Sequence, residues 1–255
     1  MNNTKPNGKI AFITGANRGI GLETARGLGK LGVTVLLGSR DPAKGEKAAA
    51  ELRRDGVAQV ETVEFEVLKR EDHRHLAKML EKRFGRLDIL VNNAGIQRES
   101  AEFAAPEGFN DTSTVSEAAL RETFDTNFFA VIALTQTLLP LIRHSPAGRI
   151  VNLSSILGSL TLHADPASPI YKAKAFAYDA SKTAINAFTV HLAAELRNTP
   201  IKVNAAHPGW VKTALGGSGA PLEVSEGGKT SVQLATLAAD GPTGGYFHLG
   251  QSLPW

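Results

Sequence analysis

The stretch KIAFITGANRGIG, Lys9 to Gly21, decides the fold. Its first six residues are a short, mostly apolar run of the kind that forms a strand buried on both faces. Gly15, Gly19 and Gly21 follow, between this strand and the helix expected after it. Glycine permits a tight turn without a Cβ in the way, so a dinucleotide pyrophosphate could rest on the helix N-terminus. The spacing is not the usual G-x-G-x-x-G, and an ordinary glycine-rich turn stays equally open.

The rest of the chain repeats this alternation of strand and helix. Segments with helical spacing, such as Pro42–Arg54, Glu71–Phe84 and Ser116–His144, separate short β-branched runs. Such alternation predicts a parallel sheet with right-handed crossovers. No repeat or linker divides the chain. We therefore predict an α/β protein, a single doubly wound Rossmann domain over residues 1–255, with helices on both faces of a seven-stranded parallel sheet. Its predicted strands are Lys9–Thr14, Val33–Gly38, Val60–Val67, Leu87–Asn93, Arg149–Ser154, Ile201–Ala206 and Tyr246–Leu249.

The composition argues against several kinds of partner. The chain is 42% hydrophobic, with a net charge of +3 from 28 Lys and Arg against 25 Asp and Glu. No basic run with interleaved aromatics occurs, so we expect no nucleic acid. The absence of cysteine excludes disulfides and thiolate chemistry. His73 and His75 would face different ways on a helix, so we expect no metal site. The longest apolar run, Phe128–Leu134, is too short to cross a membrane, and no signal peptide is seen, so we expect a cytoplasmic protein.

The end of the second predicted strand indicates the cofactor. It reads LLGSRD, so Ser39 stands where an NAD enzyme places an acidic residue for the ribose hydroxyls, and Arg40 follows. An arginine fork suits a 2′-phosphate, and Arg18 could approach the same phosphate from the glycine loop. The alternative is that both arginines are solvated and that Asp41 neutralises Arg40. We predict NADP(H) in preference to NAD.

Two tyrosines compete for the role of a catalytic acid. Tyr178 and Lys182 are four residues apart and so share one face of a helix. A lysine ammonium beside a phenol would lower the tyrosine pKa towards the range useful in proton transfer. Tyr171 has Ala175 at the same offset and is interpreted as a pocket wall or a surface residue. Tyr178 is therefore the predicted acid.

The order of five motifs resembles the short-chain dehydrogenase/reductase family. They are TGANRGIG, the NNAG of residues 92–95, a serine after the fifth strand, the YDASK of residues 178–182 and the HPGWVKT of residues 207–213. The closing stretch DGPTGGYFHLGQSLPW also resembles the NADPH-dependent carbonyl reductase branch of that family. The resemblance implies an oxidoreductase that reversibly reduces a ketone or aldehyde to the alcohol with NADPH.

The resemblance also implies a role for particular residues. Tyr178 would protonate the carbonyl oxygen, and Lys182 would tune Tyr178 and bind the nicotinamide ribose. Ser155 would hold the carbonyl oxygen, and it is preferred to Ser154 because Ile156-Leu157-Gly158 follow it. Asn127 would bend its helix and help hold a water. The implied cofactor-binding residues are Gly15, Asn17, Arg18, Gly19, Ile20, Gly21, Arg40, Glu66, Val67, Asn93, Ala94, Gly95, Tyr178, Lys182, Pro208, Gly209, Val211 and Thr213.

The substrate pocket is expected to be apolar. Ile156, Leu157, Trp210 and Leu215 would line it, which favours hydrophobic or aromatic carbonyl compounds, and residues 210–224 would form a mobile lid. Two departures from the family pattern stand out. Glu66-Val67 replaces the usual Asp-Val, and Tyr178 follows Ser155 by 23 positions, which is longer than usual. The extra piece would lie near a helix that relatives use to associate, so a homo-oligomer, dimer or tetramer, stays open. Two other functions also stay open, an NADP-sensing regulator without activity and a purely structural oligomer.

Overall fold

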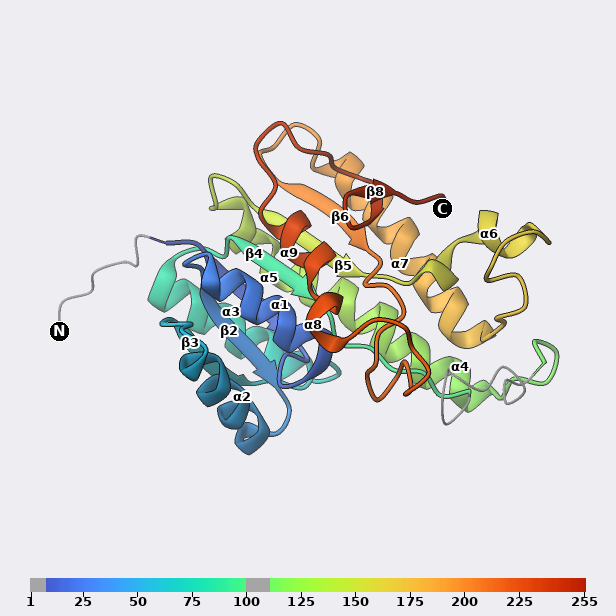
Figure 1. Ribbon diagram of the computed structural model, residues 1–255. Coiled ribbons are helices and arrows are strands. Elements are labelled where there is room, and N and C mark those ends of the chain that lie inside the picture. Colours follow the sequence, from blue (N-terminus) through green and yellow to red (C-terminus); the bar gives the residue numbers. More distant parts are fainter. Residues whose placement is uncertain (1–7, 100–110) are drawn as a thin grey trace.

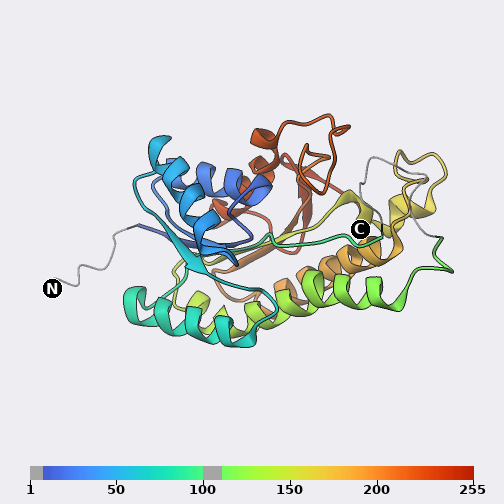
Figure 2. The same cartoon turned by 90° about the horizontal axis from the view of Figure 1, so that it is seen from below.

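The computed structural model describes residues 8–99 and 111–255 of the chain. One sheet runs through the centre with helices on both faces (Figures 1 and 2). Its strands are β1 Ile10–Thr14, β2 Thr34–Ser39, β3 Val60–Glu64, β4 Ile89–Asn92, β5 Arg149–Leu153, β6 Lys202–Ala206, β7 Tyr246–His248 and β8 Gln251–Ser252. The α-helices are α1 Gly19–Lys30, α2 Pro42–Arg54, α3 Arg70–Phe84, α4 Glu117–Phe124, α5 Ala130–Arg143, α6 Leu160–Ala164, α7 Phe176–Glu195, α8 Val224–Gly227 and α9 Lys229–Ala235.

The strand order is β3-β2-β1-β4-β5-β6-β7-β8, and the first seven strands are parallel. The chain moves outward from β1 in one direction and then in the other, which is the doubly wound topology that the sequence predicts. In such a sheet, ligands bind at the carboxyl ends of the strands where the order reverses, here between β1 and β4. The glycine-rich turn after β1 lies at this point.

The predicted number of strands is wrong by one. A short eighth strand, β8, pairs antiparallel with β7 at the sheet edge. Leu249 and Gly250 connect the two strands and both have positive φ, 46° and 82°, as the tight turns of β-hairpins require. A two-residue strand has too few positions to show a periodic pattern. The predicted strand Val60–Val67 is also too long, because β3 ends at Glu64.

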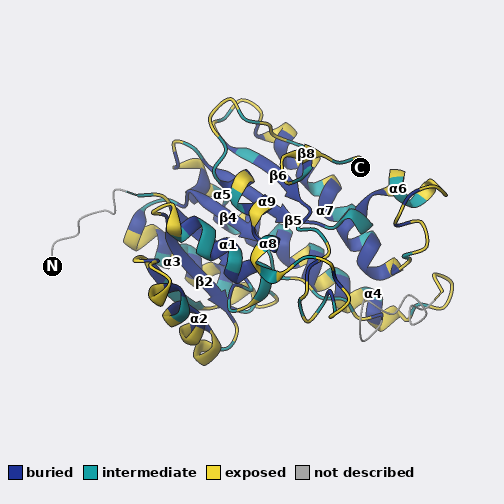
Figure 3. Cartoon of the chain, viewed as in Figure 1, coloured by how far each residue is buried: buried dark blue, intermediate teal, exposed yellow. Residues whose placement is uncertain are grey.

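The strand side chains alternate between two cores. In β1, Ala11 and Ile13 belong to the core beneath α1, α2 and α9, while Ile10 and Phe12 belong to the core beneath α3, α5 and α7. Successive side chains of a strand point to opposite faces, so an all-apolar strand serves both cores. The centre of the sheet is buried, and the exposed residues lie on the outer helices and loops (Figure 3).

The predicted helix Ser116–His144 forms a run with a wider turn inside it. Ser116 caps α4 by accepting a hydrogen bond from the Ala119 amide, a π-helical turn covers Asp125–Phe129, and α5 continues the run. By length and composition the run Glu117–Arg143 could cross a membrane, but 44% of its apolar window is buried inside the fold. A core helix of an α/β domain passes the same test. The cytoplasmic location stays a prediction.

Candidate active site

The glycine-rich turn has the shape of a phosphate cradle. Gly15 and Gly19 have positive φ, 63° and 59°, which residues with a Cβ rarely adopt. A Cβ on Gly21 would lie 2.5 Å from Asn93 Nδ2 and 2.7 Å from Gly15 O. Residue 18 is the N-cap of α1 and makes no side-chain cap bond. The turn therefore places backbone rather than side chains at the start of α1, and the residues present fit a dinucleotide pyrophosphate.

Asn93 and Thr14 join this turn to the NNAG turn after β4. Thr14 Oγ1 accepts hydrogen bonds from the Asn93 and Ala94 amides, both at 2.9 Å. Asn93 Nδ2 donates to the Thr14 and Gly15 carbonyls at 2.8 and 3.2 Å. Sequence reasoning gave Thr14 no role, since a threonine at the end of a strand carries no signal of its own. Asn93 fixes the shape of the cradle from the neighbouring strand.

The two arginines predicted at the cofactor phosphate have no side-chain partner in residues 8–99 and 111–255. Among the described residues, neither Arg18 nor Arg40 has an ion pair or a hydrogen-bonded side chain, and both are exposed. Asp41 is occupied elsewhere, because it accepts the Lys44 amide at 3.1 Å and pairs with Lys44 Nζ at 3.1 Å. Asp41 and Arg40 form no ion pair in the described part of the chain, and the alternative that both arginines are solvated surface charges stays open. Both guanidinium groups remain available for an anion.

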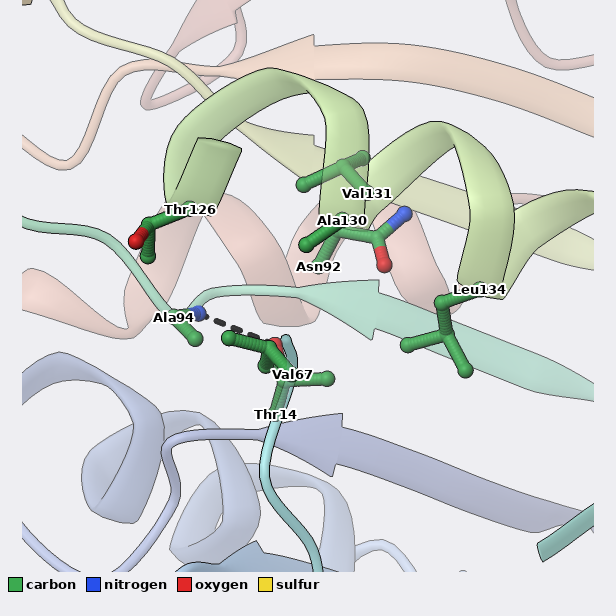
Figure 4. Close-up of a pocket in the computed structure, with 8 residues that line it drawn as sticks. All are labelled: Thr14, Val67, Asn92, Ala94, Thr126, Ala130, Val131 and Leu134. Atoms are coloured by element: carbon green, nitrogen blue, oxygen red, sulfur yellow. Dashed lines mark hydrogen bonds between the residues drawn. The ribbon is translucent and has the colours of Figure 1, made fainter. Parts of the chain in front are cut away.

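A small hollow lies beside the NNAG turn (Figure 4). Its volume is about 10 Å³, and its lining combines the predicted Val67 and Ala94 with residues from the π-helical turn and α5. The members that sequence reasoning missed are Thr14, Asn92, Thr126, Ala130, Val131 and Leu134. Asn92 is buried and bonds Thr135 Oγ1 and Asn152 Oδ1, so its role is structural. The Glu66 amide donates to Asp72 Oδ2 at 2.8 Å, which shapes the loop leading to Val67.

Tyr178, Lys182 and Ser155 come together at the carboxyl end of the sheet. Tyr178 and Lys182 lie on one face of α7, with Lys182 Nζ 5.5 Å from the centre of the Tyr178 ring. The Ser155 side chain hydrogen-bonds the Tyr178 phenol, whereas Ser154 is buried and donates to Asn186 Oδ1 at 2.6 Å. The structure thus brings Ser155, and not Ser154, to the tyrosine.

The protonation of this group differs from the sequence expectation. Burial raises the pKa of Tyr178 well above its ordinary value, and only the bond from Ser155 lowers it. Burial also lowers the pKa of Lys182 to about 8, and its ammonium donates to the Leu153 carbonyl at 2.8 Å. The spacing of Tyr178 and Lys182 shows that the two share a face, but it does not show how completely the fold removes them from water.

Asn127 lies in the π-helical turn, and its side chain is fully engaged. Its Oδ1 accepts the Ile96 amide at 2.8 Å, and its Nδ2 donates to Ile96 O at 2.9 Å and to Ser181 Oγ at 3.0 Å. A Cβ built on Gly95 would lie 3.3 Å from Asn127 Oδ1 and 3.6 Å from Lys182 Nζ. Asn127 therefore lies close to Lys182, but its amide group ties the NNAG loop to the catalytic helix.

The predicted lid, residues 210–224, makes hydrogen bonds within itself. Trp210 Nε1 donates to Gly216 O at 2.8 Å, and the Gly216 amide donates to Thr213 Oγ1 at 3.0 Å. Val211 and Leu222 form a bridge between the two ends of the loop. Trp210 is 46% exposed at the surface. Its motion as a lid stays a prediction.

The remaining predicted residues lie on the turns around this loop. Gly209 has φ 87°, and a Cβ there would meet Leu222 Cδ1 at 2.3 Å. Ile156 and Leu157, both partly exposed, form a 3₁₀ turn directly after Ser155. His207, expected to pack locally, accepts the Ile156 amide through Nδ1 at 3.2 Å. Burial lowers the pKa of His207 to about 3, so its ring is neutral.

A buried ionic cluster at the start of α7 was missed by sequence reasoning. Glu99 accepts the amides of Ala177 and Tyr178, and His163 lies 3.3 Å from Asp179 Oδ2. Glu99 is 78 positions from Ala177, and no local spacing connects the two. Tyr171, by contrast, is 39% exposed and lies beneath Lys174 Nζ, as a surface residue would. Within residues 8–99 and 111–255, no group of three His, Asp or Glu could hold a metal ion.

Comparison with known proteins identifies the family. Residues 9–221 match the short chain dehydrogenase family, so the chain belongs to it, as the motifs predict. The chain is 36% identical to the short-chain dehydrogenase anuI of Penicillium roqueforti over 91% of its length and 89% of that protein. It is 29% identical to carbonyl reductase [NADPH] 1 of Bos taurus, covering 96% of this chain and 98% of the relative. The structure of the NADPH-bound carbonyl reductase from chicken fatty liver superposes with a TM-score of 0.79 at 29% identity, covering 97% of this chain and 99% of that chain.

Proposed function

We propose that this protein reduces a ketone or aldehyde to the alcohol with NADPH, and that Tyr178 donates the proton. The observation that carries the proposal is the meeting of Tyr178, Ser155 and Lys182 beside the glycine cradle. Its class, an NADP-dependent oxidoreductase of the short-chain dehydrogenase/reductase family, is confirmed by the family match and by the carbonyl reductases among its relatives. Beyond this class, we propose that the protein reduces a carbonyl group and that Tyr178 is the proton donor.

The cofactor is NADP(H), as predicted, and solved relatives contain it. When bound, it supplies the hydride, while the protein supplies binding, orientation and the proton. In our proposal the cradle of Gly15, Gly19 and Gly21 receives the pyrophosphate. The unpaired guanidinium groups of Arg18 and Arg40 bind the 2′-phosphate, because a buried or paired arginine could not turn to it.

In our proposal Tyr178 donates its proton from the neutral phenol. Burial raises its pKa and so keeps the phenol protonated, but a higher pKa also makes it a weaker acid, so stabilisation of the resulting phenolate by Lys182 is part of the proposal. Ser155 already hydrogen-bonds the phenol and can share that bond with the carbonyl oxygen. Lys182, whose pKa is lowered to about 8, carries a positive charge at neutral pH and stabilises the negative charge that develops on oxygen.

The substrate is proposed to be a hydrophobic or aromatic carbonyl compound. Partly exposed Ile156 and Leu157 lie directly after Ser155, and the exposed Trp210 and the partly exposed Leu215 lie in the loop of residues 210–224. Pockets that bind small molecules are mostly apolar with a few placed polar groups, and this combination matches that description.

A panel of carbonyl compounds assayed with NADPH and with NADH tests the proposal. We expect turnover of hydrophobic ketones or aldehydes with NADPH and much less with NADH. The variant Arg40→Asp should weaken NADPH by about 30-fold, or about 2 kcal/mol, and leave NADH nearly unchanged, since only NADPH carries the 2′-phosphate. Binding of NADPH without turnover of any carbonyl or alcohol would favour an NADP-sensing regulator instead. Failure to bind NADPH would favour a structural role.

A further inference from the structure

The catalytic helix begins without a cap of its own. Helix α7 starts at Phe176, and its N-cap residue, Ala175, has no side chain that could accept a hydrogen bond. The first amides of a helix have no partner inside the helix and need an acceptor from elsewhere. Tyr178 is the third residue of this helix, so its own amide is one of those donors. The position of the proposed acid therefore depends on what binds these amides.

Glu99 supplies the missing acceptors from the loop after β4. Its Oε1 accepts the Ala177 amide and its Oε2 accepts the Tyr178 amide, both at 3.0 Å. The side chain is buried, with only 6% of the residue exposed. A carboxylate at a helix N-terminus is also stabilised by the positive end of the helix dipole. Glu99 thus does from a distance what an N-cap side chain does locally.

The same loop reaches the other side of the Tyr178 main chain. Ser181 Oγ donates to the Tyr178 carbonyl at 2.7 Å and accepts a hydrogen bond from Asn127 Nδ2. Asn127 in turn binds both the amide and the carbonyl of Ile96. The loop of residues 96–99 is therefore connected to the amide of Tyr178 through Glu99 and to its carbonyl through Asn127 and Ser181.

We infer that Glu99 is a positioning residue that fixes the main chain of Tyr178 and so sets where the phenol meets the substrate. The inference rests on the proposed function, in which Tyr178 is the acid. A misplacement of a catalytic group by about 1 Å can cost a factor of about 100 in rate. Glu99 does not touch the substrate, and its effect has to pass through the first turn of α7.

The test compares Glu99→Ala and Glu99→Gln with the control Glu122→Gln. Glu122 pairs with Arg98, the residue next to Glu99, at 2.9 Å, and both are more than half exposed. The control therefore perturbs the same loop without touching α7. We expect Glu99→Ala to lower kcat by about 10-fold or more, with KM for NADPH within about two-fold of the parent. Glu99→Gln keeps one acceptor oxygen but loses the charge, so its kcat should lie between that of Glu99→Ala and that of the parent. The control should match the parent.

Two further measurements separate positioning from a loss of folded protein. If Tyr178 is displaced, proton transfer slows relative to the other steps, so the solvent deuterium isotope effect on kcat should rise. A smaller folded fraction would lower the rate without changing that effect. Hydrogen exchange of fragments covering residues 175–182 should become faster in Glu99→Ala, where two amides lose their acceptor, and faster by less in Glu99→Gln, where one does. If Glu99→Ala does not fold, the same measurements are made on Glu99→Gln.

The outcomes distinguish this inference from the proposed function. A parent protein that reduces no carbonyl compound defeats the proposed function, while the exchange of residues 175–182 still decides whether Glu99 holds the Tyr178 amide. An active parent whose folded Glu99 variants keep the parental kcat, isotope effect and exchange rates would overturn the inference and leave the proposed function standing.

Discussion

Tyr178 and Tyr171 lie seven positions apart but in opposite environments. Tyr178 is buried on α7 beside Ser155 and Lys182, while Tyr171 is 39% exposed beneath Lys174. Tyr178→Phe keeps the ring and its packing but removes the proton donor, so we expect kcat to fall by about 100-fold or more, the range for a lost general acid. Binding of NADPH, measured by fluorescence titration, should stay nearly intact.

Tyr171→Phe is the matched control for this experiment. We expect its kcat to stay within about three-fold of the parent, because its hydroxyl contacts no reacting group in the proposed mechanism. Steady-state kinetics of both variants across pH provide the comparison. An inactive Tyr171→Phe beside an active Tyr178→Phe would contradict the assignment of the acid.

Asp179, next to the proposed acid, should make stability depend on pH. Burial raises its pKa from 3.8 to about 6, its bond with His163 lowers it in part, and the charge of Glu99 raises it. A raised folded-state pKa means that the folded protein binds this proton more tightly, so the stabilisation is complete below about pH 4 and is lost as the pH rises through about 6. An asparagine cannot ionise. As the pH rises over this range, the free energy of unfolding of Asp179→Asn should therefore increase relative to that of the parent, by up to about 3 kcal/mol.

Urea unfolding at about pH 4.5 and about pH 7.5 checks this sign. The comparison is with Asp165→Asn, which changes an exposed aspartate between Ser155 and Tyr178, and whose difference from the parent should change less between the two conditions. If Asp179→Asn differs from the parent by the same amount at both pH values, the buried carboxylate does not titrate as argued.

At the scale of single elements, α1 is packed against the NNAG turn with no room for a side chain. A Cβ on Gly21 would lie 2.5 Å from Asn93 Nδ2 and 2.7 Å from Gly15 O, the two atoms that close the cradle. Gly21→Ala should therefore cost about 2 kcal/mol of stability and weaken NADPH binding by about 10-fold or more, because the strain moves the phosphate cradle itself. Thermal unfolding and cofactor titration measure the two effects.

Gly27→Ala tests whether any alanine in α1 would act the same way. Its Cβ would meet the Cγ2 methyl of Val232 at 2.6 Å, which is the end of a side chain and not backbone. We expect some loss of stability there but unchanged affinity for NADPH. Equal loss of affinity in both variants would mean that the effect comes from the helix as a whole.

At the scale of the whole molecule, Arg149 joins segments that are far apart in the sequence. It is 2% exposed, and its guanidinium donates only to main-chain carbonyls. The acceptors are Gly148 and Pro200 for Nη1, Leu237 and Ala238 for Nη2, and Leu237 again for Nε. Because a buried charge needs every one of its donors satisfied, this arrangement ties β5 to the loops before β6 and after α9.

Arg149→Met should lower the free energy of unfolding by about 3 kcal/mol or more, since several buried carbonyls lose their donor. Arg149 begins β5, at the end of the sheet opposite the active site, so kcat per folded molecule should not change. Arg143→Met removes an exposed pair with Glu195 and should cost about 1 kcal/mol or less. A similar loss in the two variants, measured by urea unfolding, would refute this role of Arg149.

The sequence by itself determined the doubly wound topology, and it proposed the central residues of the candidate site. The continuous apolar run of β1 and the glycines at positive φ are local properties, because they depend on residues a few positions apart. The pair Tyr178 and Lys182 is also local, since both lie on one helix four residues apart. The two-residue strand β8 and the true end of β3 at Glu64 were not predicted, because neither leaves a periodic pattern of its own in the sequence.

Only the tertiary structure decided how these residues behave. The pKa of Tyr178 is raised and not lowered because burial outweighs the hydrogen bond with Ser155, and burial is a property of the packed fold. Asp41 pairs with Lys44, which leaves Arg40 available, a choice that the sequence left open. Glu99 reaches the start of α7 across 78 positions because the loop after β4 passes beside the start of that helix. Contacts of this kind leave no periodic trace in the chain, so the sequence proposed the central groups of the candidate site, and the fold determined what holds and tunes them.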